Sequence, residues 1–156
     1  MHRLLPAPRG LTRGIAAALA VPFLVGLALL TLTPTRVEER MPDLLDLVLA
    51  TAHRIGWDSL DFTRLEILAN VLVFVPVGIF AFVLMPRRLW LLAVLLGPAI
   101  SLGIELAQRL ALPHRAATVS DVIANSSGAL IGVALAVCCT LLFAPRATAT
   151  RTLEAP

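Results

Sequence analysis

The chain alternates long apolar runs with short polar segments. The apolar runs cover residues 14–32, 67–85, 89–106 and 122–143. Each is close to the ~20 residues that an α-helix needs to cross the ~30 Å hydrocarbon core of a bilayer. None shows the apolar–polar alternation of a transmembrane β-strand, and helices satisfy their own backbone hydrogen bonds in lipid. The pattern predicts an all-α integral membrane protein, a bundle of four transmembrane helices within residues 14–143.

The first run also has the basic start of a signal peptide, because Arg3, Arg9 and Arg13 precede it. No A-x-A-like cleavage site follows in residues 31–36, and the 19 residues of the run exceed the usual apolar region of a signal peptide. We interpret this run as an uncleaved membrane anchor.

The charges of the connecting segments predict an orientation. Residues 1–13, 86–88 and 144–156 together hold seven Arg and one acid. Residues 33–66 and 107–121 hold six Arg and eight acids. Because cytoplasmic loops carry the excess of basic residues, we expect both termini inside the cell, with a cytoplasmic N-terminus and a mobile cytoplasmic tail at 144–156.

Composition narrows the function classes. Apolar residues make up 58% of the chain, charged residues only 15%, and the mean hydropathy is +0.89. This argues against an ordinary soluble enzyme. All 13 basic residues are Arg and lie scattered between apolar runs, so no nucleic-acid-binding patch is expected. The adjacent Cys138 and Cys139 lack metal-ligand spacing, and we predict neither a metal nor a cofactor.

The first outer segment holds a predicted short helix. Asp43 is expected to cap it and Gly56 to end it. Its apolar face is expected to consist of Leu44, Leu45, Val48, Leu49 and Ala52. An interfacial helix on the outer leaflet, a lid over the bundle and a packed connector all fit this pattern.

Polar residues gather at one level of the predicted bundle. Asn70 lies near the outer end of the second span, and Glu105 and Gln108 end the third. Asp121 and Asn125 begin the fourth, with Arg109 and Arg115 expected in the loop above them. Because polar groups are costly inside a membrane, such a cluster is a candidate functional site. The predicted ligand-binding residues are Asn70, Glu105, Gln108, Arg115, Asp121 and Asn125.

Each of these residues also has a structural explanation. Thr118 to Asp121 and Thr63 to Glu66 both have the spacing of a capping box at a helix start, and Glu105 has the spacing of a helical ion pair with Arg109. In the functional interpretation, the Arg side chains clamp an anionic phosphate headgroup. Glu105 and Asp121 are the candidate catalytic residues, as general bases.

Small residues and prolines are expected to shape the packing. Gly128 and Gly132 form a G-x-x-x-G motif, which permits close approach of two helices in lipid. Pro76 lies inside the second predicted helix and Pro98 inside the third, where a missing N–H can kink a span.

Together these segments resemble the VanZ-like family of small bacterial membrane proteins. The matching stretches are N-V-L-V-F-V-P-V-G at 70–78, E-L-A-Q at 105–108, Arg115, and D-V-I-A-N-S-S-G-A-L-I-G at 121–132, within a core region of 61–135. The motif positions are Asn70, Pro76, Gly78, Glu105, Gln108, Arg115, Asp121, Asn125, Gly128 and Gly132. The chain departs from the family at Thr118 and Ser120, where many members are acidic.

The resemblance implies a polytopic plasma-membrane protein of a family named for a member that confers low-level resistance to teicoplanin, a lipoglycopeptide. Three functions follow as hypotheses. The first is outer-leaflet binding of the drug's lipid anchor or of a lipid-linked envelope precursor, which lowers drug susceptibility. The second is an enzyme acting on a lipid-linked envelope substrate, and the third is a structural or partner protein of the envelope machinery. The expected partners are membrane lipid, such a precursor or a glycopeptide, and further copies of the chain.

Overall fold

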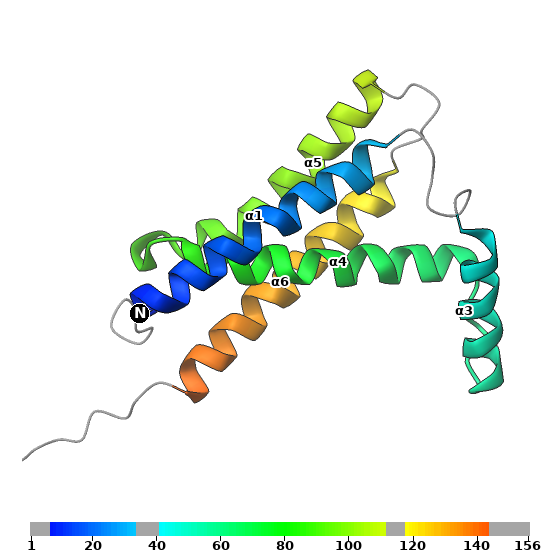
Figure 1. Ribbon diagram of the computed structural model, residues 1–156, viewed down its shortest axis with the longest axis horizontal. Helices are drawn as coiled ribbons and strands as arrows, with labels where there is room; N and C mark the ends of the chain where they lie inside the picture. Colours follow the sequence, from blue (N-terminus) through cyan, green and yellow to red (C-terminus); the bar gives the residue numbers. More distant parts are fainter. Residues whose placement is uncertain (1–6, 34–40, 112–117, 144–156) are drawn as a thin grey trace, which may run out of the picture.

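The computed structural model describes residues 7–33, 41–111 and 118–143. These residues form five α-helices, one 3-10 turn and no strand (Figure 1). The elements are α1 (Gly10–Leu32), α3 (Pro42–Arg54), α4 (Phe62–Leu84), η1 (Arg87–Leu89), α5 (Leu92–Ala111) and α6 (Val119–Leu142). Four of them, α1, α4, α5 and α6, are long and apolar enough to cross a membrane. The predicted all-α, four-span architecture is confirmed.

The helices extend beyond the apolar runs that predicted them. α4 begins at Phe62 and α6 at Val119, whereas the runs begin at residues 67 and 122. α5 continues to Ala111, past the end of its run at 106. An apolar run marks the part of a helix that lies in hydrocarbon, and polar terminal turns continue the same helix toward the membrane surface. The predicted tail at 144–156 lies outside the described residues.

The closest helix contact joins α4 to α6, which cross in the middle of the molecule (Figure 1). A Cβ atom placed on Gly128 would lie 2.0 Å from the carbonyl oxygen of Val71, and one on Gly132 would lie 2.0 Å from that of Val75. Gly78 of α4 is equally close to the backbone of α6, with the Ala129 oxygen 2.0 Å from its would-be Cβ. The two backbones therefore touch through their glycines, the arrangement that G-x-x-x-G permits in lipid.

Aromatic and small apolar side chains fill the interior around this contact. Phe74 and Phe82 of α4 are almost fully buried, and α6 contributes Ala129 and Val133. The outward faces are just as apolar: Leu19, Leu29, Leu95, Leu102 and Leu141 are each more than half exposed. Such a surface suits hydrocarbon and not water. The helices continue through Pro76 and Pro98, both of which are half-buried.

Helix α3 stands apart from the bundle, beside the beginning of α4 (Figure 1). The predicted helix exists, but Asp43 does not cap it: Met41 occupies the N-cap, Pro42 the first position, and Asp43 lies in the first turn. There its carboxylate faces the positive end of the helix dipole. Gly56 follows the helix with a φ of 91°, a left-handed conformation that favours glycine. Only Ala52 of the predicted apolar face is buried.

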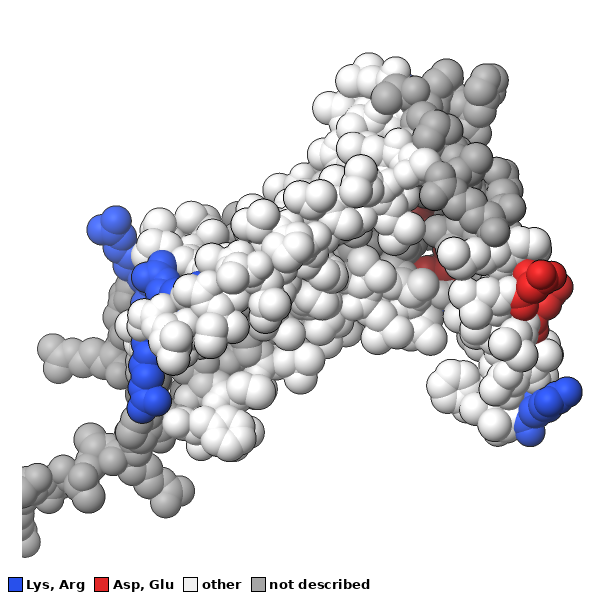
Figure 2. Space-filling view, in the orientation of Figure 1, with Lys and Arg blue, Asp and Glu red and all other residues white. Residues whose placement is uncertain are grey.

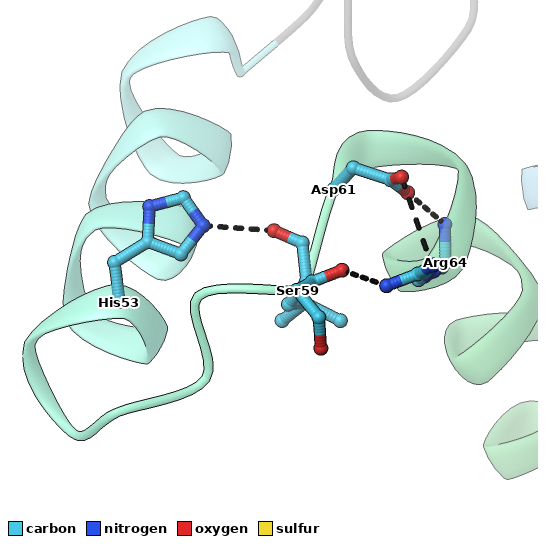
Figure 3. A network of polar contacts seen from close by, with 5 residues as sticks. His53, Ser59, Asp61 and Arg64 are labelled. Atoms are coloured by element: carbon cyan, nitrogen blue, oxygen red, sulfur yellow. Dashed lines mark hydrogen bonds and ion pairs between the residues drawn. The ribbon is translucent and has the colours of Figure 1, made fainter.

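A small polar network connects α3 to α4 (Figure 3). His53 Nε2 lies 2.8 Å from the carbonyl oxygen of Leu60, and Arg64 donates a hydrogen bond to the carbonyl oxygen of Ser59. Asp61 is the N-cap of α4, and its Oδ1 accepts from the Arg64 amide at 2.8 Å. The capping box predicted from Thr63 to Glu66 is therefore wrong, because the helix starts earlier than the apolar run indicates.

Candidate functional site

The two ends of the bundle differ in charge. Arg atoms gather at the end where the chain begins, whereas acidic side chains lie at the far end, over α3, with further Arg atoms beside them (Figure 2). We name these the arginine end and the acidic end. Arg13 near the start of α1 donates to the carbonyl oxygen of Leu84 at the end of α4, at 2.6 Å, so both lie at the arginine end. Further acidic atoms are visible in a hollow between the bundle and α3 (Figure 2).

Asp121 connects α6 to α4 at the acidic end. Asn70 Nδ2 donates to Asp121 Oδ1 at 3.1 Å. The second carboxylate oxygen, Oδ2, accepts from the Thr118 amide at 3.3 Å, and the capping box predicted from Thr118 to Asp121 is confirmed. The half-buried carboxylate of Asp121 thus completes the capping box of α6 and also accepts a hydrogen bond from the neighbouring helix α4.

A second polar contact lies one turn deeper, between α6 and α5. Asn125 Nδ2 donates to Ser101 Oγ at 3.0 Å, and both side chains are buried, with exposed fractions of 8% and 1%. Gln108, near the end of α5, is also buried and donates from Nε2 to the carbonyl oxygen of Thr31 at 2.8 Å. This bond attaches α5 to the last turn of α1.

Within the part of the chain that the structure describes, two buried acceptors of this cluster have no hydrogen-bond partner: Glu105 Oε1 and Asn125 Oδ1. The predicted ion pair between Glu105 and Arg109 does not form, so this expectation is wrong. Arg109 is exposed in the last turn of α5 and not in the following loop.

The packing of α5 on α6 places Glu105 relative to Asp121. The would-be Cβ of Gly97 lies 2.2 Å from the Ala129 Cβ, and one turn further along α5 Ser101 meets Asn125. The two helices are antiparallel, so a step of four residues toward the C-terminus of α5 corresponds to a step of four residues toward the N-terminus of α6. Continuing by one turn brings Glu105 to the level of Asp121, with two carboxylates on adjacent helices at the acidic end.

The structure thus brings together most of the predicted ligand-binding residues. Asn70, Asp121 and Asn125 lie on the contacts around the first turns of α6, Glu105 shares a face of α5 with Ser101, and Gln108 contacts α1. Arg115 lies outside the described residues. Sequence reasoning missed Ser101, although its position four residues before Glu105 was an available signal. Among the described residues, no three His, Cys, Asp or Glu side chains are placed to hold a metal ion.

The cluster is chemically an acceptor site. Carboxylate and amide oxygens accept hydrogen bonds, so free ones in a buried setting select a ligand that donates: a hydroxyl, an amide N–H or an ammonium group. A phosphate would need the donors of an Arg; Arg109, in the last turn of α5, is exposed, and Arg115 lies outside the described residues.

The fold and the four apolar helices define a multi-pass helical membrane protein with four spans. The chain matches the family described as VanZ/LLP1 over residues 19–143 and belongs to that family. The match begins within α1, covers the other three spans in full and includes the core region at 61–135. Neither a curated protein nor a solved structure is significantly similar to the chain.

Proposed function

We propose that this VanZ/LLP1 protein binds the polar head of a lipid-bearing envelope ligand at the acidic end of its bundle. The observation that carries the proposal is the pair of buried acceptors without partners, Glu105 Oε1 and Asn125 Oδ1. A buried acceptor without a donor costs about 1–3 kcal/mol. A cluster that served only to hold the helices together would gain stability by pairing these atoms.

The ligand class follows from the acceptors. Glycopeptides and lipid-linked envelope precursors both carry hydroxyl and amide N–H groups, which are the donors that Glu105 and Asn125 lack. Teicoplanin and the lipid-linked precursors also carry a lipid chain, which would lie against the exposed apolar faces of the spans. Ile67 and Leu68, on the turn before Asn70, are among these exposed residues.

The orientation predicted from the Arg distribution puts the acidic end at the outer leaflet, where both ligand types are encountered. If the protein binds the lipid anchor of the drug, the drug cannot reach the envelope precursor that it targets. If the protein binds the precursor, the precursor is no longer accessible to the drug. Either mode lowers teicoplanin susceptibility, in line with the property for which the family is named.

The test compares a sensitive Gram-positive host expressing wild-type chain, Glu105→Gln or Asn125→Leu, with membrane abundance quantified for each. Asp58→Asn is the matched control, because this carboxylate lies exposed between α3 and α4. We expect the wild type and the control to raise the inhibitory concentration of teicoplanin. Protection limited to teicoplanin would mean that its lipid anchor is held, and protection that extends to a glycopeptide without a lipid chain would mean that the precursor is held. The two site variants should lose this protection at equal abundance.

Direct binding separates the proposal from an indirect effect. Purified chain in lipid nanodiscs should bind teicoplanin or a lipid-linked precursor, and Glu105→Gln should weaken that binding about tenfold, since a hydrogen bond to a charged group contributes about 1.5–3 kcal/mol. Unchanged binding in both site variants would overturn the proposal.

A second candidate function is catalysis on a lipid-linked substrate. The observation that favours it is again Glu105, whose free carboxylate oxygen can accept a proton from a bound hydroxyl. Turnover of a lipid-linked precursor by the purified wild type, abolished in Glu105→Gln while binding persists, would establish this alternative.

A further inference from the structure

A second site lies at the arginine end, away from the polar cluster. An apolar groove of about 300 Å³ opens between α1, α4 and α5. Its walls include Ala20, Leu24, Val77, Leu84, Leu96 and Ile100, and every residue that lines it is apolar. This volume is at the lower end of the range of small-molecule sites. The groove therefore suits a slender apolar group and offers nothing to a polar solute.

The mouth of the groove carries Arg13. Arg13 precedes Ala20 by seven residues and Leu24 by eleven, so all three share one face of α1. Its Nη2 donates to the carbonyl oxygen of Leu84, a residue of the groove wall, at 2.6 Å. This bond uses one N–H of the guanidinium and holds the side chain beside the groove, while other N–H donors of the fork stay available.

Arg87 lies at the same mouth. It follows Pro86, which also lines the groove. Its Nη1 donates to the carbonyl oxygen of Phe82 at 2.8 Å, and its guanidinium carbon lies 4.1 Å from the centroid of the Phe82 ring. These contacts fix the charge in place. Burial, and then the charge of Arg13, lower the pKa of Arg87 from its ordinary value.

We propose that this groove binds one acyl chain of an acidic phospholipid, whose phosphate is held between Arg13 and Arg87. Charge complementarity carries the choice of occupant. Two guanidinium groups at the membrane surface match a phosphate, which Arg binds bidentately. An acidic lipid is favoured over a zwitterionic one because the latter carries its own cation next to the phosphate. The site is independent of the proposed function at the acidic end.

The test uses the purified full chain in detergent and native mass spectrometry. Phosphatidylglycerol and phosphatidylcholine with the same acyl chains are added in equal amounts. We expect phosphatidylglycerol to be preferred, and Arg13→Gln and Arg87→Gln each to reduce its binding about tenfold, since hydrogen bonds to charged groups contribute about 1.5–3 kcal/mol. Arg88→Gln is the matched control: Arg88 lies in the same turn, is exposed and should change binding little.

A groove-filling variant tests the apolar half of the site. Ala20 is buried, with an exposed fraction of 4%, and Ala20→Phe fills the groove without changing charge. We expect it to lose phosphatidylglycerol binding while Leu19→Phe, on the exposed face of the same helix, keeps it. If Arg13→Gln does not fold, Arg13→Lys keeps the charge without the bidentate fork and should bind at an intermediate level.

Three results would overturn the proposal. Equal losses in Arg88→Gln and Arg13→Gln would mean a diffuse basic surface. Equal binding of the two lipids would mean that Arg13 and Arg87 do not discriminate between the two headgroups. Full phosphatidylglycerol binding by a folded Ala20→Phe variant would mean that the groove does not hold the acyl chain.

Discussion

Asn125 donates through Nδ2 to Ser101 Oγ at 3.0 Å, and the Oδ1 of the same amide is buried with no partner among the described residues. The pair therefore does two things at once. It fixes α6 against α5 by a hydrogen bond, and it leaves an acceptor without a partner one turn from Asp121. A bond that positions a free acceptor is what a rigid binding site requires.

Removal of the Ser101 hydroxyl should destabilise the bundle. Ser101→Ala leaves Asn125 Nδ2 without an acceptor as well, and interhelical hydrogen bonds in membranes contribute about 0.6–2 kcal/mol. We expect a loss of this size in unfolding of the purified chain by sodium dodecyl sulfate. The control is Ser127→Ala, because the Ser127 hydroxyl donates to the Ile123 carbonyl of its own helix. Equal losses in the two variants would contradict a cross-helix role for Ser101.

The glycine contacts between α4 and α6 should tolerate no added methyl group. Gly128→Ala and Gly132→Ala place a Cβ 2.0 Å from a backbone oxygen of α4, and overpacking of this kind costs about 1–3 kcal/mol or more. The backbones must separate, so we expect reduced folded protein in membranes and easier unfolding in detergent. Gly103→Ala is the control.

No atom lies within 4 Å of the Cβ position at Gly103. There the substitution should raise stability by about 0.5–1 kcal/mol through the usual helix preference of Ala over Gly. A Gly128→Ala chain as stable as Gly103→Ala would mean that α4 and α6 do not pack through their glycines.

Sequence alone could locate the polar cluster but not its internal bonds. The alternating direction of the spans was enough to predict that Asn70, Asp121 and Asn125 share one level, because helix length fixes depth in a membrane. Which side chains pair depends on helix rotation, and the apolar runs carry little rotational signal since their outer faces are as apolar as their inner ones. For that reason Ser101 was missed and the Glu105–Arg109 pair was wrongly expected.

The cap of α4 gives a third prediction. Asp61→Ala removes the acceptor of the Arg64 amide, and loss of an N-cap costs about 1 kcal/mol. We expect faster hydrogen exchange at the first amides of α4. Asp61→Asn keeps an acceptor oxygen and should exchange like the wild type. Thr63→Ala should also leave exchange unchanged, and if it accelerates exchange as much as Asp61→Ala, the capping box expected from Thr63 operates after all.

The same cap shows where sequence reasoning about the fold was limited. Hydropathy identified all four spans and their order, because the energy that fixes a span is summed over about 20 residues. A helix end depends on one or two side chains, and Asp61 and Thr63 are both chemically suitable caps for α4. Only the position of the preceding backbone decides between them, as it does where Met41 and not Asp43 is the N-cap of α3.

The orientation of the chain gives the last prediction, and the proposed function depends on it. Cysteine labelling with a membrane-impermeant maleimide can measure it in intact Gram-positive cells. Cys138 and Cys139 are exposed on α6 and are first replaced by Ala. Ser59→Cys then places a thiol between α3 and α4 at the acidic end, and Leu89→Cys places one in η1 at the arginine end, with every Arg retained.

The arginine end should stay inside because basic residues resist translocation. Ser59→Cys should therefore react in intact cells and Leu89→Cys only after lysis. The reverse pattern would turn Glu105 and Asn125 toward the cytoplasm, where an external glycopeptide cannot reach them, and would leave a cytoplasmic lipid-linked precursor as the only ligand of the proposed class for this site.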